Sequence, residues 1–301
     1  MATTFFHSQV LFNIVQKANT FHPVYLNYSN NNHFLGLRVG IIFSKRIVIY
    51  GFPTNSIEEL SELLPLIQKY SKGIIYTEFR NLYDQTILKE VLAQYKFYWL
   101  DWLNIFVNTT DKEVMWKSIN DGKQLQIRKS LNNGAELCLA NCVEEVHQFY
   151  NILSNLYKNK IHKPLPDWSF FKAFYEETKD TEWGRFILVK CQGKVIAGMM
   201  CPITPNQEMY EWYMAGLDHK YKGLGIYPSV LVTWGAMKYA CKHNIPKFNF
   251  MGAGQPDKPY GVRDFKMQFG GVLVNSGRFI KINKPLLYKL GRTYLKIKGR
   301  L

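Results

Sequence analysis

The sequence has few cysteines, and none of them lies at a spacing that builds a site. The five cysteines are odd in number and include no C-x-x-C pair. Structural zinc sites need such pairs, and a disulfide framework needs an even set. The sequence indicates neither and predicts no metal site. Reduced, mostly buried thiols are typical of a cytosolic protein.

Long apolar runs are also absent. The apolar segment 10–15 is interrupted by Asn13 and is too short for the core of a signal peptide. No stretch reaches the roughly 18 apolar residues that a membrane-spanning helix requires. We therefore expect a cytoplasmic protein.

Acidic residues are scarce relative to basic ones. Lys and Arg number 38 against 23 Asp and Glu, which gives a formal net charge of +15. An excess of this size favours anionic partners: nucleic acid, an anionic membrane surface or phosphorylated substrates. Hydrophobic residues make up 47% of the chain and charged residues 20%, which is typical of a globular protein. The 301 residues give room for two domains.

The order of apolar patterns predicts a first α/β domain over residues 1–110. A hairpin turn is expected at residues 29–33, between two of its strands. The predicted elements are a helix at 8–16, strands at 24–28, 34–43 and 46–52, a helix at 55–72, a strand at 74–79, a helix at 83–94 and a strand at 98–107.

Residues 111–133 are predicted to form one connecting helix, ended by the Asn133-Gly134 pair as a helix C-cap. Its polar face is basic, with Lys123, Arg128 and Lys129 toward the C-terminal end. Such a face either lines a basic cleft or is simply solvated.

A second α/β domain is predicted over residues 134–279, and the helix 280–301 is expected to join the first domain. Two similar halves in tandem suggest a duplicated fold with a cleft between the copies. The elements predicted in this half are a strand at 135–140, helices at 143–159 and 168–178, strands at 185–191, 194–202 and 209–216, a helix at 227–243 and a strand at 247–250.

The segment 251–271 is the most distinctive part of the chain. A short strand runs into the turn Gly252-Ala253-Gly254, and Lys266 then lies between Phe265 and Phe269 before a Gly-Gly pair. Glycines let a backbone turn tightly or approach a ligand closely. A lysine among aromatic residues can rest its stem on apolar surface and present one cation to an anionic group.

A second glycine-rich loop, Lys220 to Gly225, precedes the helix predicted at 227–243. Glycines two apart at a helix entrance leave backbone N–H groups free to bind an anion. The positions of Lys220, Gly223 and Gly225 resemble the pyrophosphate loop of GNAT acyltransferases, although lysine stands where that family has Arg or Gln. A plain tight turn is the alternative.

Several motifs occur in the order found in the Fem family. They are Trp116-Lys117-Ser118-Ile119, Ile127-Arg128-Lys129-Ser130, Trp234-Gly235-Ala236-Met237, Phe248-Asn249-Phe250-Met251-Gly252 and Phe265-Lys266-x-x-Phe269-Gly270. Together they resemble that family over about residues 115–271. The resemblance implies two GNAT-like domains, no bound cofactor, and transfer of an aminoacyl group from aminoacyl-tRNA to an amine of a peptidoglycan precursor.

The resemblance also implies roles for residues. Lys266 would be the cation nearest the transferring ester, and Phe265 would shape the pocket beside it. Aminolysis of an ester builds negative charge on the carbonyl oxygen, which a fixed cation stabilises. Glu211, Tyr213 and His219 are candidates for a base or for positioning the substrate. The alternation of Glu211 and Tyr213 along a strand predicts that both point the same way.

The chain departs from the classical bridge-forming enzymes in two respects. It carries no inserted charged helical hairpin in its second half, and Asn249 replaces the usual Asp at the strand end. Both departures bear on the tRNA donor and the peptidoglycan acceptor.

The tail predicts a basic amphipathic helix, with Leu286, Leu290, Tyr294 and Ile297 on one side. This stripe either lies on an anionic membrane surface or docks on the first domain. The first reading would place the protein peripherally at the inner face of the membrane and suit a lipid-linked acceptor.

The sequence thus predicts a two-domain, GNAT-like α/β acyltransferase that uses aminoacyl-tRNA. One alternative is an acyl-coenzyme A enzyme whose Gly223/Gly225 loop binds the pyrophosphate. Another is a non-catalytic module that binds tRNA or anionic lipid.

Overall fold

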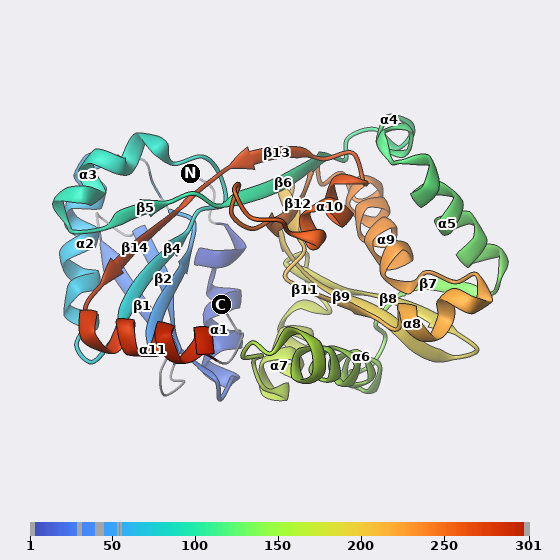
Figure 1. The fold of residues 1–301 in the computed structure, drawn as a ribbon, viewed down its shortest axis with the longest axis horizontal. Helices are drawn as coiled ribbons and strands as arrows, with labels where there is room; N and C mark the ends of the chain where they lie inside the picture. The colour runs from blue at the N-terminus through green and yellow to red at the C-terminus, as the bar shows by residue number, and fades with distance from the viewer. Residues whose placement is uncertain (1–3, 29–31, 40–44, 53, 55, 298–301) are drawn as a thin grey trace. The chain divides into compact units, whose positions relative to one another are not determined.

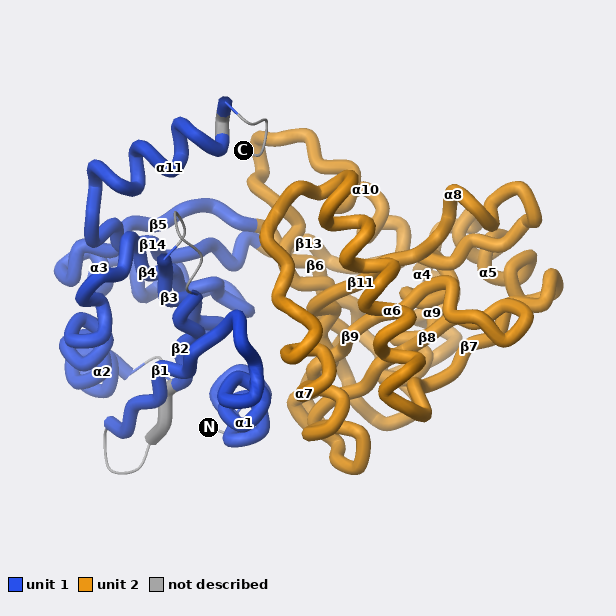
Figure 2. Tube along the Cα trace, turned by 90° about the horizontal axis from the view of Figure 1, so that it is seen from below, with its two compact units in different colours: residues 1–102, 275–301 blue, residues 103–274 orange. Residues whose placement is uncertain are grey.

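The predicted α/β fold class is confirmed by the computed structural model, which describes residues 4–28, 32–39, 45–52, 54 and 56–297 (Figure 1). The chain divides into two compact units (Figure 2). Unit 1 comprises Met1–Trp102 and Asn275–Leu301, and unit 2 comprises Leu103–Val274. Most of the hairpin turn expected at 29–33 and the last four residues of the tail helix lie outside the described residues.

Unit 1 is one sheet with helices packed on it. The strand order is β1-β2-β3-β4-β14-β5, so a strand from the end of the chain lies inside the N-terminal sheet. Its elements are η1 (Phe5–His7), α1 (Gln9–Lys17), β1 (Phe21–Tyr28), β2 (Asn32–Val39), β3 (Arg46–Tyr50), α2 (Ile57–Tyr70), β4 (Tyr76–Arg80), η3 (Thr86–Leu88), α3 (Lys89–Gln94), β5 (Tyr98–Leu100), β14 (Arg278–Ile282) and α11 (Pro285–Ile297).

Local sequence explains why these helices begin where they do. Ser8 caps α1 because its side-chain oxygen accepts a hydrogen bond from the Leu11 N–H, and Ser56 caps α2 in the same way. The leucines of α2 pack with α3 on one face of the sheet, around the buried ring of Phe79. That ring is stacked on Phe52, with centroids 4.2 Å apart. This cluster is the core of unit 1.

Unit 2 is built around a larger sheet of order β13-β6-β12-β10-β9-β8-β7, with β11 paired to β9. Helix α9 packs on one face of this sheet, and α6 and α7 pack on the other. The elements are β6 (Leu103–Asn108), α4 (Lys112–Ser118), α5 (Asp121–Asn132), β7 (Ala135–Leu139), α6 (Val143–Leu156), η4 (Tyr157–Ile161), α7 (Trp168–Thr178), β8 (Gly184–Cys191), β9 (Lys194–Thr204), β10 (Glu208–Tyr210), β11 (Tyr213–Gly216), α8 (Asp218–Tyr221), η5 (Lys222–Leu224), α9 (Pro228–Lys242), β12 (Lys247–Gly252), α10 (Gly261–Met267) and β13 (Val272–Asn275).

The single helix predicted over 111–133 is wrong. The backbone of Ile119 is extended, and the Asn120 side chain accepts a hydrogen bond from the Gly122 N–H to cap a new helix. The Gln124 amide donates to the carbonyl oxygens of Trp116 and Ile119, at 3.1 and 2.9 Å, and so satisfies the end of the first helix. Both helices, α4 and α5, belong to unit 2.

Two predicted strands are also interrupted. The strand expected at 98–107 is split into β5 and β6, which belong to different sheets. The strand expected at 209–216 is split at Glu211 and Trp212 into β10, which pairs with both β12 and β9, and β11, which pairs with β9. Apolar periodicity alone could not show these breaks, because the residues on each side are apolar in both arrangements.

No helix in the described part of the chain is both long and apolar enough to cross a membrane.

Replacing Phe79 with Ala should lower the free energy of unfolding of unit 1 by about 3–5 kcal/mol, because the change leaves a cavity in its core. Chemical denaturation followed by circular dichroism measures this loss. Ile87→Ala in the same unit is the control, since Ile87 is 78% exposed. Equal effects of the two substitutions would contradict the described core.

Candidate functional site

Lys266 is buried rather than presented to solvent. It lies on α10 and only 5% of its surface is exposed. Its ammonium nitrogen lies 2.6 Å from the carbonyl oxygen of Phe250, 3.4 Å from that of Gly252 and 3.0 Å from Oε1 of Glu211. An ammonium group has three protons, so these three acceptors match its capacity. The structure therefore brings together two residues that the sequence analysis had placed in separate roles.

The end of β12 is shaped to receive this lysine. The pairing of β12 with β6 shifts register between Asn249 and Gly252, and Met251 has a positive φ of 54°. Such an irregularity interrupts the ladder and redirects local groups. The Asn249 side chain stabilises the distortion, because its Oδ1 accepts a hydrogen bond of 2.6 Å from the Met251 N–H. The carbonyl groups of Phe250 and Gly252 consequently face Lys266.

Glu211 lies at the break between β10 and β11 and is 8% exposed. Its N–H donates to the Asn249 carbonyl oxygen at 2.9 Å, which ties this break to β12. Its Oε2 has no hydrogen-bond partner among the described residues, and neither does Nδ2 of Asn249. Buried polar atoms are nearly always paired, so an acceptor and a donor left over beside one ion pair mark a candidate site for chemistry.

Tyr213 and His219 lie in different surroundings. Tyr213 lies on strand β11, whereas Glu211 lies in the break before it. The prediction that both side chains point the same way from one strand is therefore wrong. The Tyr213 ring packs against aromatic rings that include Phe170 and Phe171 of α7. His219 is exposed on the one-turn helix α8.

In the glycine loop before α9, the backbone N–H groups of Gly225 and Ile226 donate within the chain. Gly225 adopts a left-handed conformation, with φ of 70°, and its N–H donates to the Lys222 carbonyl oxygen. A Cβ added there would lie 2.5 Å from the Asn133 side chain. The next N–H, of Ile226, donates to the Tyr221 carbonyl oxygen. Lys220 and Gly223 are exposed.

The first turn of α9 is already capped by side chains. The Tyr227 N–H donates to the Ser130 hydroxyl at 2.8 Å, and the Ser229 N–H donates to Oδ1 of Asp218 at 3.1 Å. The Ser229 hydroxyl donates to the other oxygen of Asp218. The Asp218 carboxylate thus occupies the place at this helix N-terminus where a bound anion would be expected. Sequence analysis missed this residue, whose signal is an acidic residue just before the glycine loop.

The three basic residues predicted to line a cleft have unequal positions. The ammonium nitrogen of Lys123 lies 4.9 Å from the centroid of the Phe265 ring. Burial lowers the pKa of Lys123, while the charge of Asp218 acts in the opposite direction. Arg128 covers the Trp116 ring at 5.3 Å, and Lys129 is exposed. Phe265 and Lys123 are therefore neighbours in the structure.

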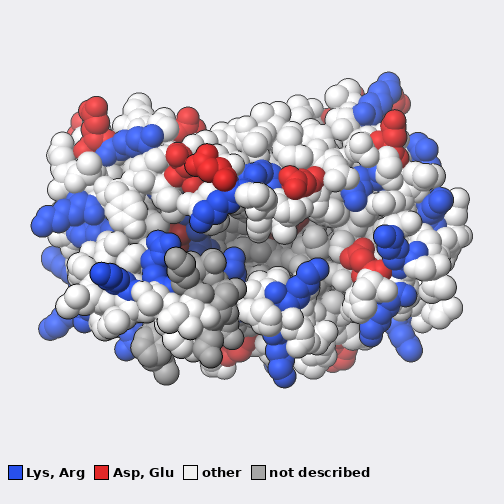
Figure 3. All heavy atoms as spheres, in the orientation of Figure 1, with Lys and Arg blue, Asp and Glu red and all other residues white. Residues whose placement is uncertain are grey.

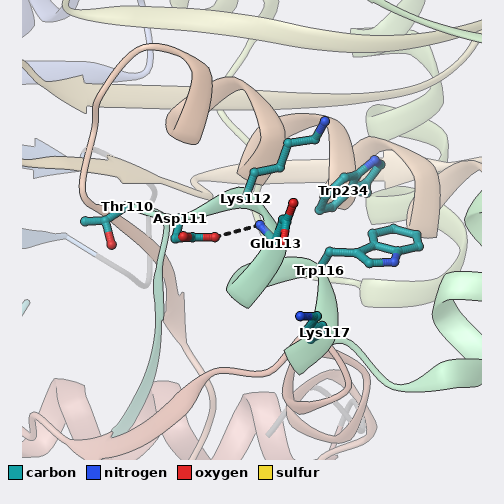
Figure 4. Close-up of a pocket in the computed structure, with 7 residues that line it drawn as sticks. All are labelled: Thr110, Asp111, Lys112, Glu113, Trp116, Lys117 and Trp234. Atoms are coloured by element: carbon teal, nitrogen blue, oxygen red, sulfur yellow. Dashed lines mark hydrogen bonds between the residues drawn. The ribbon is translucent and has the colours of Figure 1, made fainter.

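A pocket of about 650 Å³ opens at the start of α4 (Figure 4). Its aromatic wall is the pair Trp116 and Trp234, with ring centroids 4.8 Å apart in an edge-to-face arrangement. Lys266 and Glu211 do not line it. The lining residues are Thr110, Asp111, Lys112, Glu113, Trp116, Lys117 and Trp234.

No group of His, Cys, Asp or Glu side chains within the described ranges could hold a metal ion.

Comparison with known proteins confirms the resemblance to the Fem family. Residues 176–296 match the model of the FemAB family, a range that contains Glu211 and Lys266. A search of curated proteins finds no match.

The fold is similar to several solved structures that cover nearly the whole chain. The crystal structure of FemX has a TM-score of 0.70 at 13% identity, covering 94% of this chain and 93% of FemX. L-PGS from Bacillus licheniformis has a TM-score of 0.64 at 13% identity, covering 95% and 92%. The C-terminal domain of a protein assigned as a lysylphosphatidylglycerol synthetase from Agrobacterium fabrum has a TM-score of 0.61 at 12% identity, covering 98% and 94%.

Replacing Lys266 with Met should destabilise unit 2 by about 3–5 kcal/mol, because it leaves Glu211 buried without its counter-charge. The double variant Lys266→Met with Glu211→Leu should recover part of this loss, since no charge then remains buried. Guanidinium unfolding of both variants measures the coupling. Lys172→Met is the control, because its pair with Glu176 is exposed and should contribute less than about 1 kcal/mol. A double variant no more stable than the single one would contradict the described pair.

Proposed function

We propose that the chain is a Fem-like transferase, because residues 176–296 match the FemAB family and the fold is similar to that of FemX. In this proposal it transfers an aminoacyl group from aminoacyl-tRNA to an amine of a cell-envelope precursor. The acceptor that we propose is a peptidoglycan or lipid-linked precursor. The observation that carries the proposal is the buried Lys266–Glu211 pair, with nitrogen and oxygen 3.0 Å apart, within the matched range.

The proposed reaction is aminolysis of an ester. The amine nitrogen bonds to the ester carbonyl carbon, negative charge builds on the carbonyl oxygen, and the bond to the tRNA hydroxyl oxygen then breaks. Lys266 is the proposed cation for this charge. The ester oxygen would replace the longest of its three contacts, the Gly252 carbonyl oxygen at 3.4 Å. Such stabilisation accelerates the reaction because it is stronger in the transition state than in the ground state.

Glu211 has two proposed roles. Its Oε1 holds the Lys266 ammonium in place. Its Oε2, which lacks a partner among the described residues, would accept the proton that the attacking amine loses and return it to the departing hydroxyl. Phe265, which neighbours Lys123, would form the wall beside the donor ester. We assign Tyr213 and His219 no part in the reaction.

The state of the glycine loop favours tRNA over acyl-coenzyme A as donor. Each N–H group at Gly225, Ile226, Tyr227 and Ser229 already donates within the chain, and Pro228 has none. A pyrophosphate would have to displace the Asp218 carboxylate as well. Basic side chains, by contrast, are spread over the face shown in Figure 3, in keeping with a net charge of +15. A large polyanion such as tRNA suits a spread of this kind.

The tail helix α11 supports a lipid-linked acceptor and a peripheral position at the inner face of the membrane. It is held to unit 1 by the Tyr288 ring, which packs edge-on against Tyr76 with centroids 5.4 Å apart, while Gly291 is buried. The apolar stripe identified from the sequence faces away from these anchors. Its exposed fractions are 80% for Leu286, 65% for Leu290, 47% for Tyr294 and 77% for Ile297.

Charge on α11 fits the same partner. The helix contains no acidic residue, whereas Lys284 just before it, Lys289 and Arg292 are exposed. An exposed apolar stripe flanked by cations binds the interface of an anionic bilayer. One structural neighbour is named for a phospholipid product, lysylphosphatidylglycerol, which accords with a lipid-linked acceptor here.

Lys266→Met should lower the turnover number for aminoacyl transfer by at least about 100-fold, because the cation for the carbonyl oxygen is lost. Affinity for charged tRNA should change by less than about threefold, since one lysine contributes little to a diffuse attraction. The assay follows labelled amino acid from charged tRNA to a lipid-linked peptidoglycan precursor, at a temperature where circular dichroism shows the variant folded. Lys258→Met, an exposed lysine in the preceding loop, is the control.

Three results would overturn the proposal. Turnover of Lys266→Met within threefold of the parent would remove Lys266 from the reaction. Transfer from acetyl-coenzyme A, with none from charged tRNA, would establish the coenzyme-dependent alternative. Salt-sensitive tRNA binding with no transfer to any amine acceptor would indicate a binding module.

Replacing Leu286 and Leu290 together with Ser should weaken binding to vesicles containing phosphatidylglycerol by at least about tenfold, because two large exposed apolar side chains are lost from the stripe. Co-sedimentation with vesicles measures this. Leu224→Ser is the matched control, since Leu224 is 64% exposed in unit 2. Equal binding by the double variant and the parent would exclude α11 as the membrane contact.

A further inference from the structure

One face of the sheet in unit 1 carries a cluster of arginines. Strands β3, β4 and β14 are neighbours in this sheet (Figure 1). Side chains alternate between the two faces of a strand, so residues two apart share a face. The face opposite the core holds Arg46, Glu78, Arg80 and Arg278. Their immediate neighbours in sequence belong to the core on the other face: Ile47, Phe79 and Phe279.

The register of the sheet places two of these arginines directly opposite each other. Arg278 pairs with Arg80 across β14 and β4, and Tyr50 pairs with Arg80 on the other side. Like charges at directly opposed positions destabilise a sheet. A fold that keeps both arginines here therefore needs negative charge beside them.

Glu78 supplies the one carboxylate of the cluster. Its Oε1 accepts a hydrogen bond of 2.6 Å from Nη1 of Arg278, and its Oε2 accepts bonds of 3.2 and 3.1 Å from Nε and Nη2 of Arg80. Burial favours the neutral acid, but the charges of Arg80, Arg278 and Arg46 outweigh it and lower the pKa of Glu78 to about 2. Arg80 and Arg278 thus share one carboxylate, and the charge of Arg46 also acts on it.

Arg278 is the arginine of this cluster whose pKa is lowered, and its guanidinium lies on an aromatic ring. Burial lowers its pKa to about 10, although Glu78 acts in the opposite direction. Its guanidinium lies 3.5 Å from the centroid of the Trp102 ring, which fixes its plane. The guanidinium group has five N–H bonds. Among the described residues, its one hydrogen-bond acceptor is Glu78, which accepts from Nη1. The side chain is 15% exposed and that of Arg80 is 28% exposed, so a ligand can reach both.

We propose that Arg278, Arg80 and Arg46, held in place by Glu78 and Trp102, form a binding site for a phosphate group that carries two negative charges. The free edge of the Arg278 guanidinium matches the spacing of two phosphate oxygens, which a lysine cannot match. The site lies wholly within unit 1 and does not depend on the transfer chemistry proposed for unit 2.

Calorimetric titration of the whole chain with inorganic pyrophosphate, at constant ionic strength, tests this site. Arg278→Met should raise the dissociation constant at least tenfold. Arg38→Met is the matched control, because Arg38 is an exposed arginine on β2 of the same sheet, and its dissociation constant should stay within twofold. Arg278→Lys should also bind pyrophosphate at least tenfold more weakly. This variant keeps the positive charge, so it tests the site even if Arg278→Met is unstable.

Parallel titrations with glycerol phosphate and with vesicles containing phosphatidic acid, both phosphomonoesters that can carry two negative charges, distinguish the source of the phosphate. Loss in Arg278→Lys of glycerol phosphate binding alone indicates a soluble phosphoester, and loss of vesicle binding alone indicates a lipid headgroup. Either outcome supports the site. Equal losses in Arg38→Met and the Arg278 variants would show a diffuse charge effect and overturn it, as would the absence of pyrophosphate binding by the parent.

Discussion

The buried ion pair between Lys266 and Glu211 is the contact on which the organisation of unit 2 depends. It joins three separate elements: α10, the break between β10 and β11, and the irregular end of β12. A buried charge is costly unless it is paired and its remaining hydrogen bonds are made. The lysine satisfies this condition fully, with two carbonyl groups and one carboxylate oxygen. The Glu211 carboxylate does not satisfy it, because its Oε2 has no hydrogen-bond partner among the described residues. An unpaired acceptor beside a firmly held cation makes this place suitable for chemistry.

Two places in unit 2 differ in the charge that the chain itself supplies. At the start of α9 the chain supplies its own carboxylate, Asp218, to the helix N-terminus. At the end of β12 it supplies a cation whose contacts include one long, weak interaction of 3.4 Å. At the first place a carboxylate of the chain stands where an anion would bind, whereas at the second a ligand can replace one of the contacts of Lys266. This contrast is the physical basis for preferring Lys266 over the glycine loop as the centre of the site.

Sequence patterns predicted the fold class, most of the elements and the Fem resemblance, because strand and helix periods and a run of ordered motifs are local properties. The interruptions at Ile119, Glu211 and between β5 and β6 could not be predicted, since each depends on side-chain bonds or partners that are distant in sequence. The pairing of Lys266 with Glu211 was missed for the same reason. These residues are 55 positions apart, and only the tertiary fold joins them. The role of Asp218 and the cluster of arginines on the sheet of unit 1 likewise correspond to no sequence motif.

The place of β14 in unit 1 has a consequence for how the chain is made. This strand, residues 278–282, lies between β4 and the edge strand β5 of the N-terminal sheet. During synthesis from the N-terminus, residues 4–102 leave the ribosome long before the strand that joins β4 to β5 exists, whereas unit 2 is contiguous and complete at Val274. Unit 1 can therefore complete its sheet only after all of unit 2 has been synthesised. Until then β4 and β5 present unpaired edges, which are open to wrong partners.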